Sequence, residues 1–366
     1  MKRLFIFILS IYSTILLADH RSFALELEDS LTHGNATFLK SRLDYESIFK
    51  KILSTDEEYI KHNEAFKTYI LNSYHLGDVI TAQIKAGADY KFHKMIQNEA
   101  LFRLVPPRGG LNYHSYQIHQ KNGQFLIKDI YLYLSGNYLS ESIEQSYHAF
   151  LYSKEPKFRS DSNKVQKVLD GERISRAQIY YQVKKYQQAQ AAIDSVEGEL
   201  MESKSYLIFK QMIYAKMDLL SFEAMAAVFE NFYPNDPSMH LTLIDGFIQI
   251  GKFDEALKRV NQLDSILLID HYLNFHRANI YFLKGHAKKA IEYSLAFHYH
   301  FPENLFGYYV ALNAYVLDNN LDGCILILNQ LKQQFQLSKF EIHQTLGEYQ
   351  YLLQSDQYNL WLNNSP

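Results

Sequence analysis

The chain has very little cysteine. Among its 366 residues there is one cysteine, Cys324. A lone thiol cannot close a disulfide within the chain, and a zinc site with four cysteine ligands is excluded for the same reason. The fold must therefore be held together by its packed core.

An excess of charge and the common catalytic motifs are also missing. The formal net charge is −3, which gives no electrostatic reason to expect a nucleic-acid partner. The 15 histidines include no His-Glu-x-x-His pair, and no glycine-rich phosphate loop is present. His298 and His300 are two residues apart, so on a helix they would point in different directions and could not chelate one ion. We expect no metal, no cofactor and no enzymatic activity.

A hydrophobic run long enough to span a bilayer is missing too, but a shorter one opens the chain. Lys2 and Arg3 precede fifteen mostly apolar residues, 4–18, which is typical of a signal peptide. Small residues at Ser22 and Ala24 predict cleavage after Ala24, hence a signal peptide at 1–24 and an exported chain, periplasmic or secreted. No cysteine lies near this point, which excludes lipoprotein processing, and the alternative is an uncleaved anchor.

The second half of the chain repeats with a period of 34 residues. Three small residues share one phase, three turn-forming residues lie five positions before them, and three aromatic residues lie nine positions before them. These sets are Ala256, Ala290 and Cys324; Gly251, Gly285 and Asn319; Phe247, Tyr281 and Tyr315. Such a period predicts stacked pairs of antiparallel helices, with a small residue where the two helices cross.

These segments resemble the tetratricopeptide repeat family. The best examples are "LTLIDGFIQIGKFDEALKRV", "FHRANIYFLKGHAKKAIEYS" and "YVALNAYVLDNNLDGCILIL", and the resemblance covers residues 170–366. It implies a right-handed superhelix of about five repeats that binds a protein or peptide in its concave groove. Cys324 would then fill a position that needs a small apolar residue, as a buried structural thiol rather than a nucleophile.

A ladder of polar residues, spaced 34 apart, is our candidate for that groove. Its members are Gln211, Asp245, Asn279 and Asn313. In the family this phase of the first helix faces the groove, and amide side chains suit the backbone of an extended peptide. Aromatic residues beside the ladder would supply apolar pockets: Tyr272, Phe275, Phe282, Phe306 and Tyr309. The competing interpretation is that these polar residues belong to the repeat's consensus and hold neighbouring helices together.

The N-terminal part, 25–155, lacks this phase. Its beginning reads as helices by apolar spacing, and Asn122-Gly123 later separates two β-rich runs, which predicts an antiparallel hairpin. Helices followed by such a hairpin loosely resemble the cystatin-like and nuclear-transport-factor-like folds. We therefore expect a mainly α chain, in which a small α+β domain precedes the repeats, with a linker over 156–169.

Polar groups around the hairpin are a second candidate site. The residues are Arg103, Tyr113, His114, Tyr116, Asp129 and Tyr131. They suggest two alternatives to a protein-binding scaffold: a carrier that holds a small molecule or lipid inside the α+β domain, or a hydrolase in which a hairpin residue acts as general acid or base. The scaffold is favoured, with a protein or peptide as partner and no membrane contact beyond the signal peptide.

Overall fold

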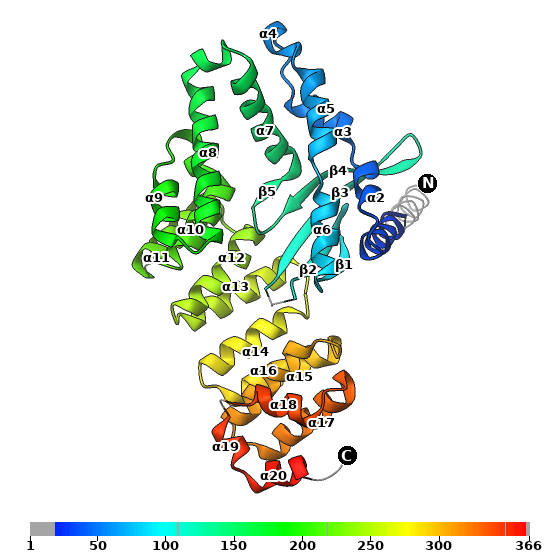
Figure 1. Cartoon of the computed structure of the whole chain (residues 1–366), viewed down its shortest axis with the longest axis vertical. Coiled ribbons are helices and arrows are strands. Elements are labelled where there is room, and N and C mark those ends of the chain that lie inside the picture. Colours follow the sequence, from blue (N-terminus) through cyan, green and yellow to red (C-terminus); the bar gives the residue numbers. More distant parts are fainter. Residues whose placement is uncertain (1–18, 108–109, 218, 348, 364–366) are drawn as a thin grey trace, which may run out of the picture. The chain divides into compact units, whose positions relative to one another are not determined.

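The computed structural model describes residues 19–107, 110–217, 219–347 and 349–363. The predicted hydrophobic run at 4–18 lies outside these residues. The chain forms two compact units, the first ending at Thr242 and the second beginning at Leu243 (Figure 1). Each unit is built mainly from helices, and the first also contains a sheet, which confirms the predicted fold class.

The first unit begins with a run of helices that form one side of its core. A helix over residues 19–32 comes first and buries Phe23, Ala24 and Leu27. The predicted cleavage point after Ala24 thus lies within this helix. The helices that follow are α2 (Ala36–Arg42), α3 (Tyr45–Ile52), α4 (Glu57–Ile60), α5 (Asn63–Ser73) and α6 (Leu76–Lys85). α2 and α6 lie in close contact at Gly77. A Cβ at this position would lie 2.6 Å from the carbonyl oxygen of Ala36.

A five-stranded antiparallel sheet follows, with its strands in chain order. They are β1 (Asp89–Ile96), β2 (Glu99–Val105), β3 (Asn112–Lys121), β4 (Gln124–Leu132) and β5 (Asn137–Tyr138). The predicted hairpin is confirmed: Asn122 and Gly123 join β3 to β4 with φ of 52° and 77°, as a two-residue turn of type I′ requires. One face of the sheet packs Phe102, Tyr116 and Ile130 into the helical core.

Helix pairs continue from the sheet. These elements are α7 (Leu139–Lys154), η1 (Phe158–Ser160), α8 (Ser162–Gln182), α9 (Tyr186–Asp194), η2 (Gly198–Glu202), α10 (Lys204–Tyr214) and α11 (Leu219–Phe232). The expected linker over 156–169 is instead η1 and the first part of α8. Phe158 and Val168 explain why, since both are buried in the core of the first unit and hold this segment against it.

The remaining helices carry the 34-residue repeat. They are α12 (Pro237–Gln249), α13 (Phe253–Ile266), α14 (Leu273–Leu283), α15 (Ala287–His300), α16 (Leu305–Leu317), α17 (Leu321–Phe335), α18 (Lys339–Thr345), α19 (Gln350–Leu353) and α20 (Asp356–Asn363). Among helices made of described residues, none has the length and apolar character needed to cross a membrane.

The small residues of the repeat are buried on the second helix of each pair. Ala256, Ala290 and Cys324 are fully buried, and their turn partners Gly251, Gly285 and Asn319 have φ between 52° and 76°. These positive φ angles let each pair of helices reverse direction, as helix ends with glycine or asparagine commonly do. The structure therefore confirms the phase of the helix pairs over residues 237–335 and the burial of their three small residues.

Candidate functional site

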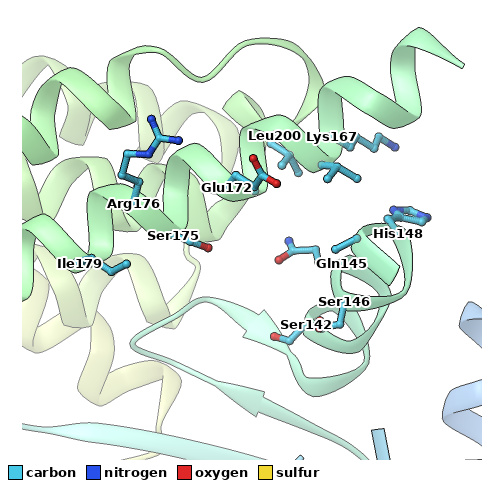
Figure 2. Close-up of a pocket in the computed structure, with 13 residues that line it drawn as sticks. Ser142, Gln145, Ser146, His148, Lys167, Glu172, Ser175, Arg176, Ile179 and Leu200 are labelled. Atoms are coloured by element: carbon cyan, nitrogen blue, oxygen red, sulfur yellow. Dashed lines mark hydrogen bonds between the residues drawn. The ribbon is translucent and has the colours of Figure 1, made fainter. Parts of the chain in front are cut away.

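The first unit contains a groove between α7 and α8 (Figure 2). Its volume is about 540 Å³, within the size range of protein ligand sites. The side chains that line it come from α7, from α8 and from Leu200 of η2. They are Ser142, Gln145, Ser146, His148, Ala149, Lys167, Val168, Gly171, Glu172, Ser175, Arg176, Ile179 and Leu200.

The groove exists because both helices place small side chains toward each other. On α7, Ser142, Ser146 and Ala149 follow a spacing of four and three residues and share one face. On α8, Gly171 and Ser175 do the same. The other face of α7 is apolar and anchors the helix in the core through residues such as Ile143 and Tyr147. The helices are thus fixed from behind while their facing sides leave room.

A buried carboxylate on α8 holds η2 in place beside the groove. Asp170 on α8 is 1% exposed, and its Oδ1 accepts hydrogen bonds from the Glu197 backbone N–H at 3.0 Å and from the Arg173 guanidinium at 2.7 Å. These bonds fix the segment that leads into η2. Leu200, which lines the groove, is positioned by this contact between α8 and η2.

A second, smaller cavity of about 290 Å³ adjoins the groove. Gln145, His148, Lys167 and Leu200 line both spaces, so the two form one continuous surface. The residues that line only the second cavity are Gly136, Asn137, Glu141, Glu144, Glu199, Ser203, Lys204, Ser205 and Tyr233. Figure 2 shows Arg176 and Ile179 toward one end of the groove and Lys167 toward the other, with Gln145 and His148 of α7 beside Lys167.

Each lysine of the second cavity already has a carboxylate partner. The Lys167 Nζ lies 2.7 Å from Glu199 Oε2. The Lys204 Nζ lies 3.1 Å from Asp236 Oδ2 and donates to the Tyr131 hydroxyl at 2.9 Å. Since Lys204 also sits over the Tyr131 ring, at 4.5 Å from its centroid, it ties α10 to strand β4.

The histidine shared by the two cavities is held in its neutral form. Burial lowers the pKa of His148, and the positive charges of Lys167 and Lys164 lower it further, against an opposing effect of Glu144. His148 therefore offers one donor and one acceptor to a ligand near neutral pH.

The six residues predicted as an N-terminal pocket do not share one pocket. Arg103 pairs with Tyr113 and Phe102 pairs with His114 across β2 and β3, so Tyr113 and His114 lie on opposite faces of the sheet. Tyr131 lies on the face of Tyr113, and Tyr116 on the face of His114. All four of these aromatic side chains are buried, and none of the six lines the groove.

Asp129 has a structural role at the start of α7. Its carboxylate accepts hydrogen bonds from the Ser140 backbone N–H at 3.1 Å and from the Ser140 hydroxyl at 2.6 Å. A carboxylate at a helix N-terminus satisfies N–H groups that have no partner within the helix and interacts favourably with the helix dipole. Asp129 therefore fixes the end of one groove wall.

His114 belongs to a closed hydrogen-bond network in the core. Its Nδ1 lies 3.2 Å from the Tyr90 hydroxyl, its Nε2 lies 3.2 Å from the Asn112 amide nitrogen, and the Tyr90 and Tyr116 hydroxyls are 2.7 Å apart. Burial lowers the pKa of His114 to about 4. The imidazole is thus neutral, and its Nε2 accepts a hydrogen bond from the Asn112 amide. Its ring nitrogens are used within the protein, which speaks against the role of general acid or base considered above.

The ladder residues of the repeats have unlike surroundings. Gln211 is 1% exposed on α10, Asp245 is exposed on α12, and Asn279 is half-buried on α14. Asn313 on α16 accepts a hydrogen bond from the Tyr349 hydroxyl. Gln211 is thus enclosed in the interior and Asn313 is engaged in a hydrogen bond within the repeats, which agrees better with a structural role for these two positions than with a groove that all four line.

The aromatic residues beside the ladder differ in the same way. Tyr272 is buried, with its ring 5.3 Å from Phe297 and 5.4 Å from Phe301 between centroids. Phe275 also packs on Phe297, while Phe306 is 40% exposed. Phe282 and Tyr309 are half-buried, and Tyr309 packs against the core of α16 and α17. Tyr272 and Phe275 thus form the interior of the α14–α15 pair.

The α7–α8 groove contains none of the site residues predicted from the sequence. α7 itself lies within the predicted N-terminal domain. The signal that could have revealed the groove is the spacing of Ser142, Ser146 and Ala149, which gives α7 a face of small side chains opposite its apolar one. That spacing alone does not show whether another helix fills the face.

The remaining candidates for chemistry are structural. Cys324 is fully buried, as predicted, and burial raises the pKa of its thiol to about 12. Over the described ranges, no group of three or more His, Cys, Asp or Glu side chains is arranged to hold a metal ion. The His298 ring packs at a tilt against that of Tyr308 with centroids 4.1 Å apart, and the His300 ring stacks on that of His271 at 3.6 Å.

No protein-family model matches the chain, and no curated protein matches it. Among solved structures the chain is similar to MamA. The chain titled MamA MSR-1 aligns with a TM-score of 0.39 and 12% identity, over 47% of this chain and 97% of its own. The chain titled MamA AMB-1 aligns with a TM-score of 0.37 and 11% identity, over 48% and 96% respectively. Likeness at this level assigns neither a family nor a function.

Proposed function

We propose that this chain is a non-catalytic scaffold that binds an extended segment of a partner protein in the groove between α7 and α8. The observation that carries the proposal is the groove itself, which runs between two helices whose facing side chains are small and polar. Exposed Gln145 and Ser175 provide amide and hydroxyl groups that can bond to a peptide backbone. The exposed side chain of Ile179 adds an apolar contact at one end.

The packing of the α+β domain argues against the carrier as the main function. A lipid or apolar ligand requires a mostly apolar cavity. On the helix-covered face of the sheet, where a cone-shaped pocket would lie, Tyr90, Phe102 and Tyr116 fill the interior.

A bulky side chain in the groove tests this proposal. The full chain would be used to select binders from a phage-displayed library of random twelve-residue peptides, and affinities would be measured by fluorescence polarisation. Ser175→Trp fills the groove and should weaken binding by tenfold or more. Gln178→Trp is the matched control, because Gln178 is exposed on the same helix but does not line the groove. Its affinity and melting temperature should stay near those of the parent.

Two results would contradict the proposal. One is a library that yields no peptide binder at all. The other is a set of binders whose affinity for Ser175→Trp, shown to be folded by its melting temperature, equals that for the parent chain.

Export is part of the proposal. Lys2 and Arg3 followed by the apolar run 4–18 support a secretory leader, so the scaffold would act outside the cytoplasm. N-terminal sequencing of the chain recovered from fractionated cells tests this. A chain that starts near Leu25 in an exported fraction is expected, and a soluble cytosolic chain that starts at Met1 would overturn the export proposal while leaving the groove untouched.

A further inference from the structure

The charges around the second cavity point to the chemistry of the partner. Three glutamates line it, Glu141, Glu144 and Glu199. Glu199 is paired with Lys167, and the cavity's other lysine, Lys204, is paired with Asp236. Within the described part of the chain, Glu141 and Glu144 take part in no ion pair. Among the described residues the cavity thus carries two carboxylates with no cation at ion-pair distance, while each of its lysines has another carboxylate as partner.

The two carboxylates are placed to act together on a ligand. Glu141 and Glu144 are three residues apart on α7, so their side chains lie on one face of the helix. Glu141 also accepts a hydrogen bond from the Tyr138 backbone N–H at 2.7 Å through Oε2, which fixes the orientation of its carboxylate. Glu144 is half-buried.

The main groove has a different charge balance. Arg176 lines only the main groove and Glu172 is one turn away on the same helix, so this part is close to neutral. Negative charge therefore increases along the continuous surface, from the Arg176 end toward the second cavity. A segment lying along it meets small polar side chains first and uncompensated carboxylates at its other end.

From this arrangement we infer that the partner segment carries a lysine or arginine side chain, which enters the second cavity beside Glu141 and Glu144. This inference rests on the proposed function, because it specifies the segment that the groove binds. An ammonium or guanidinium group at this position would replace the missing positive charge. The neighbouring residues of the segment would lie between α7 and α8, beside the small side chains of the two walls.

The test compares peptide sequences and charge variants. Peptides selected by the parent chain from the phage-displayed library should be enriched in lysine or arginine at one position relative to the unselected library. Glu144→Lys places a positive charge in the cavity and should weaken their binding about tenfold. Raising the ionic strength should also weaken the binding of these peptides to the parent chain, since salt screens the charges of the partly exposed Glu141 and Glu144. Lys154→Glu, on an exposed part of α7 outside both cavities, is the control and should have no such effect.

The decisive comparison reverses the charge in the protein and in the peptide together. A selected peptide whose basic residue is changed to glutamate should bind Glu144→Lys better than it binds the parent. Peptides that bind in the groove, as shown by their loss with Ser175→Trp, but lack any basic enrichment would overturn this inference and leave the proposed function standing. A selection without any peptide sensitive to Ser175→Trp would overturn both.

Discussion

At the scale of single residues, the buried histidine of the sheet gives a stability prediction. The pKa of His114 is lowered from 6.5 to about 4, and the cause is burial of the imidazole. Between these values the unfolded chain binds a proton at His114 and the folded chain does not. The free energy of unfolding should therefore fall as the pH is lowered from 6.5 to about 4, and His114 should account for roughly 3 kcal/mol of this loss. Above pH 6.5 the titration of His114 should have no effect on stability.

The variant His114→Gln isolates this contribution. It should lower stability at pH 7, because Tyr90 and Asn112 lose a partner, but it should also flatten the dependence on pH between 4 and 6.5. Urea unfolding at several pH values measures both effects. His33→Gln, at an exposed histidine, serves as control. An unchanged slope in the His114 variant would show that the imidazole binds its proton equally well in the folded and the unfolded chain, which contradicts the prediction.

At the scale of elements, the helix over residues 19–32 belongs to the core of the first unit. His20, Phe23 and Ala24 are at most 4% exposed, and the ring of Phe23 lies 5.9 Å from that of Phe125. Glu28 accepts a hydrogen bond from the Phe92 backbone N–H at 2.7 Å, which attaches this helix to edge strand β1. Residues before the predicted cleavage point thus contribute to the packing of the domain.

A comparison of two chain starts follows from this packing. A chain that begins at Leu25 should be less stable than one that begins at Asp19 by roughly 3 kcal/mol or more, since it lacks a buried phenylalanine. Phe23→Ala in the longer chain should reproduce most of the loss, and Arg21→Ala, at an exposed position, should not. Urea unfolding provides the measurement. Equal midpoints for the two starts would mean that residues 19–24 are dispensable for the core.

The same scale shows what the sequence could predict. The repeat phase was readable because a helix crossing needs a small residue and a helix reversal needs glycine or asparagine, as at Ala290 and Gly285. The hairpin was readable because Asn122-Gly123 fits one turn type. The grouping of His114 with Tyr113 failed because neighbours in a strand point to opposite faces. The groove could not be predicted, since it depends on how far α7 and α8 lie apart, which tertiary packing sets.

At the scale of the whole molecule, the question is which unit binds the partner. The α7–α8 groove lies in the first unit, whereas Asn279 and Asn313 of the ladder lie in the second. The proposal therefore predicts that the double variant Asn279→Ala, Asn313→Ala binds the selected peptides as tightly as the parent chain does. Its stability should fall by about 0.5–1.5 kcal/mol, because the Tyr349 hydroxyl loses the acceptor that Asn313 provides.

Fluorescence polarisation and urea unfolding, measured on one preparation of the double variant, distinguish a binding site in the α7–α8 groove from one on the ladder. Tyr349→Phe removes the same hydrogen bond from its other side and should give a similar loss of stability, so it identifies the part of the effect that belongs to Asn313. A double variant that unfolds like the parent but binds tenfold more weakly would place the binding surface on the ladder. The concave face predicted for the repeats would then be the binding site, and the space between α7 and α8 would only reflect the packing of the first unit.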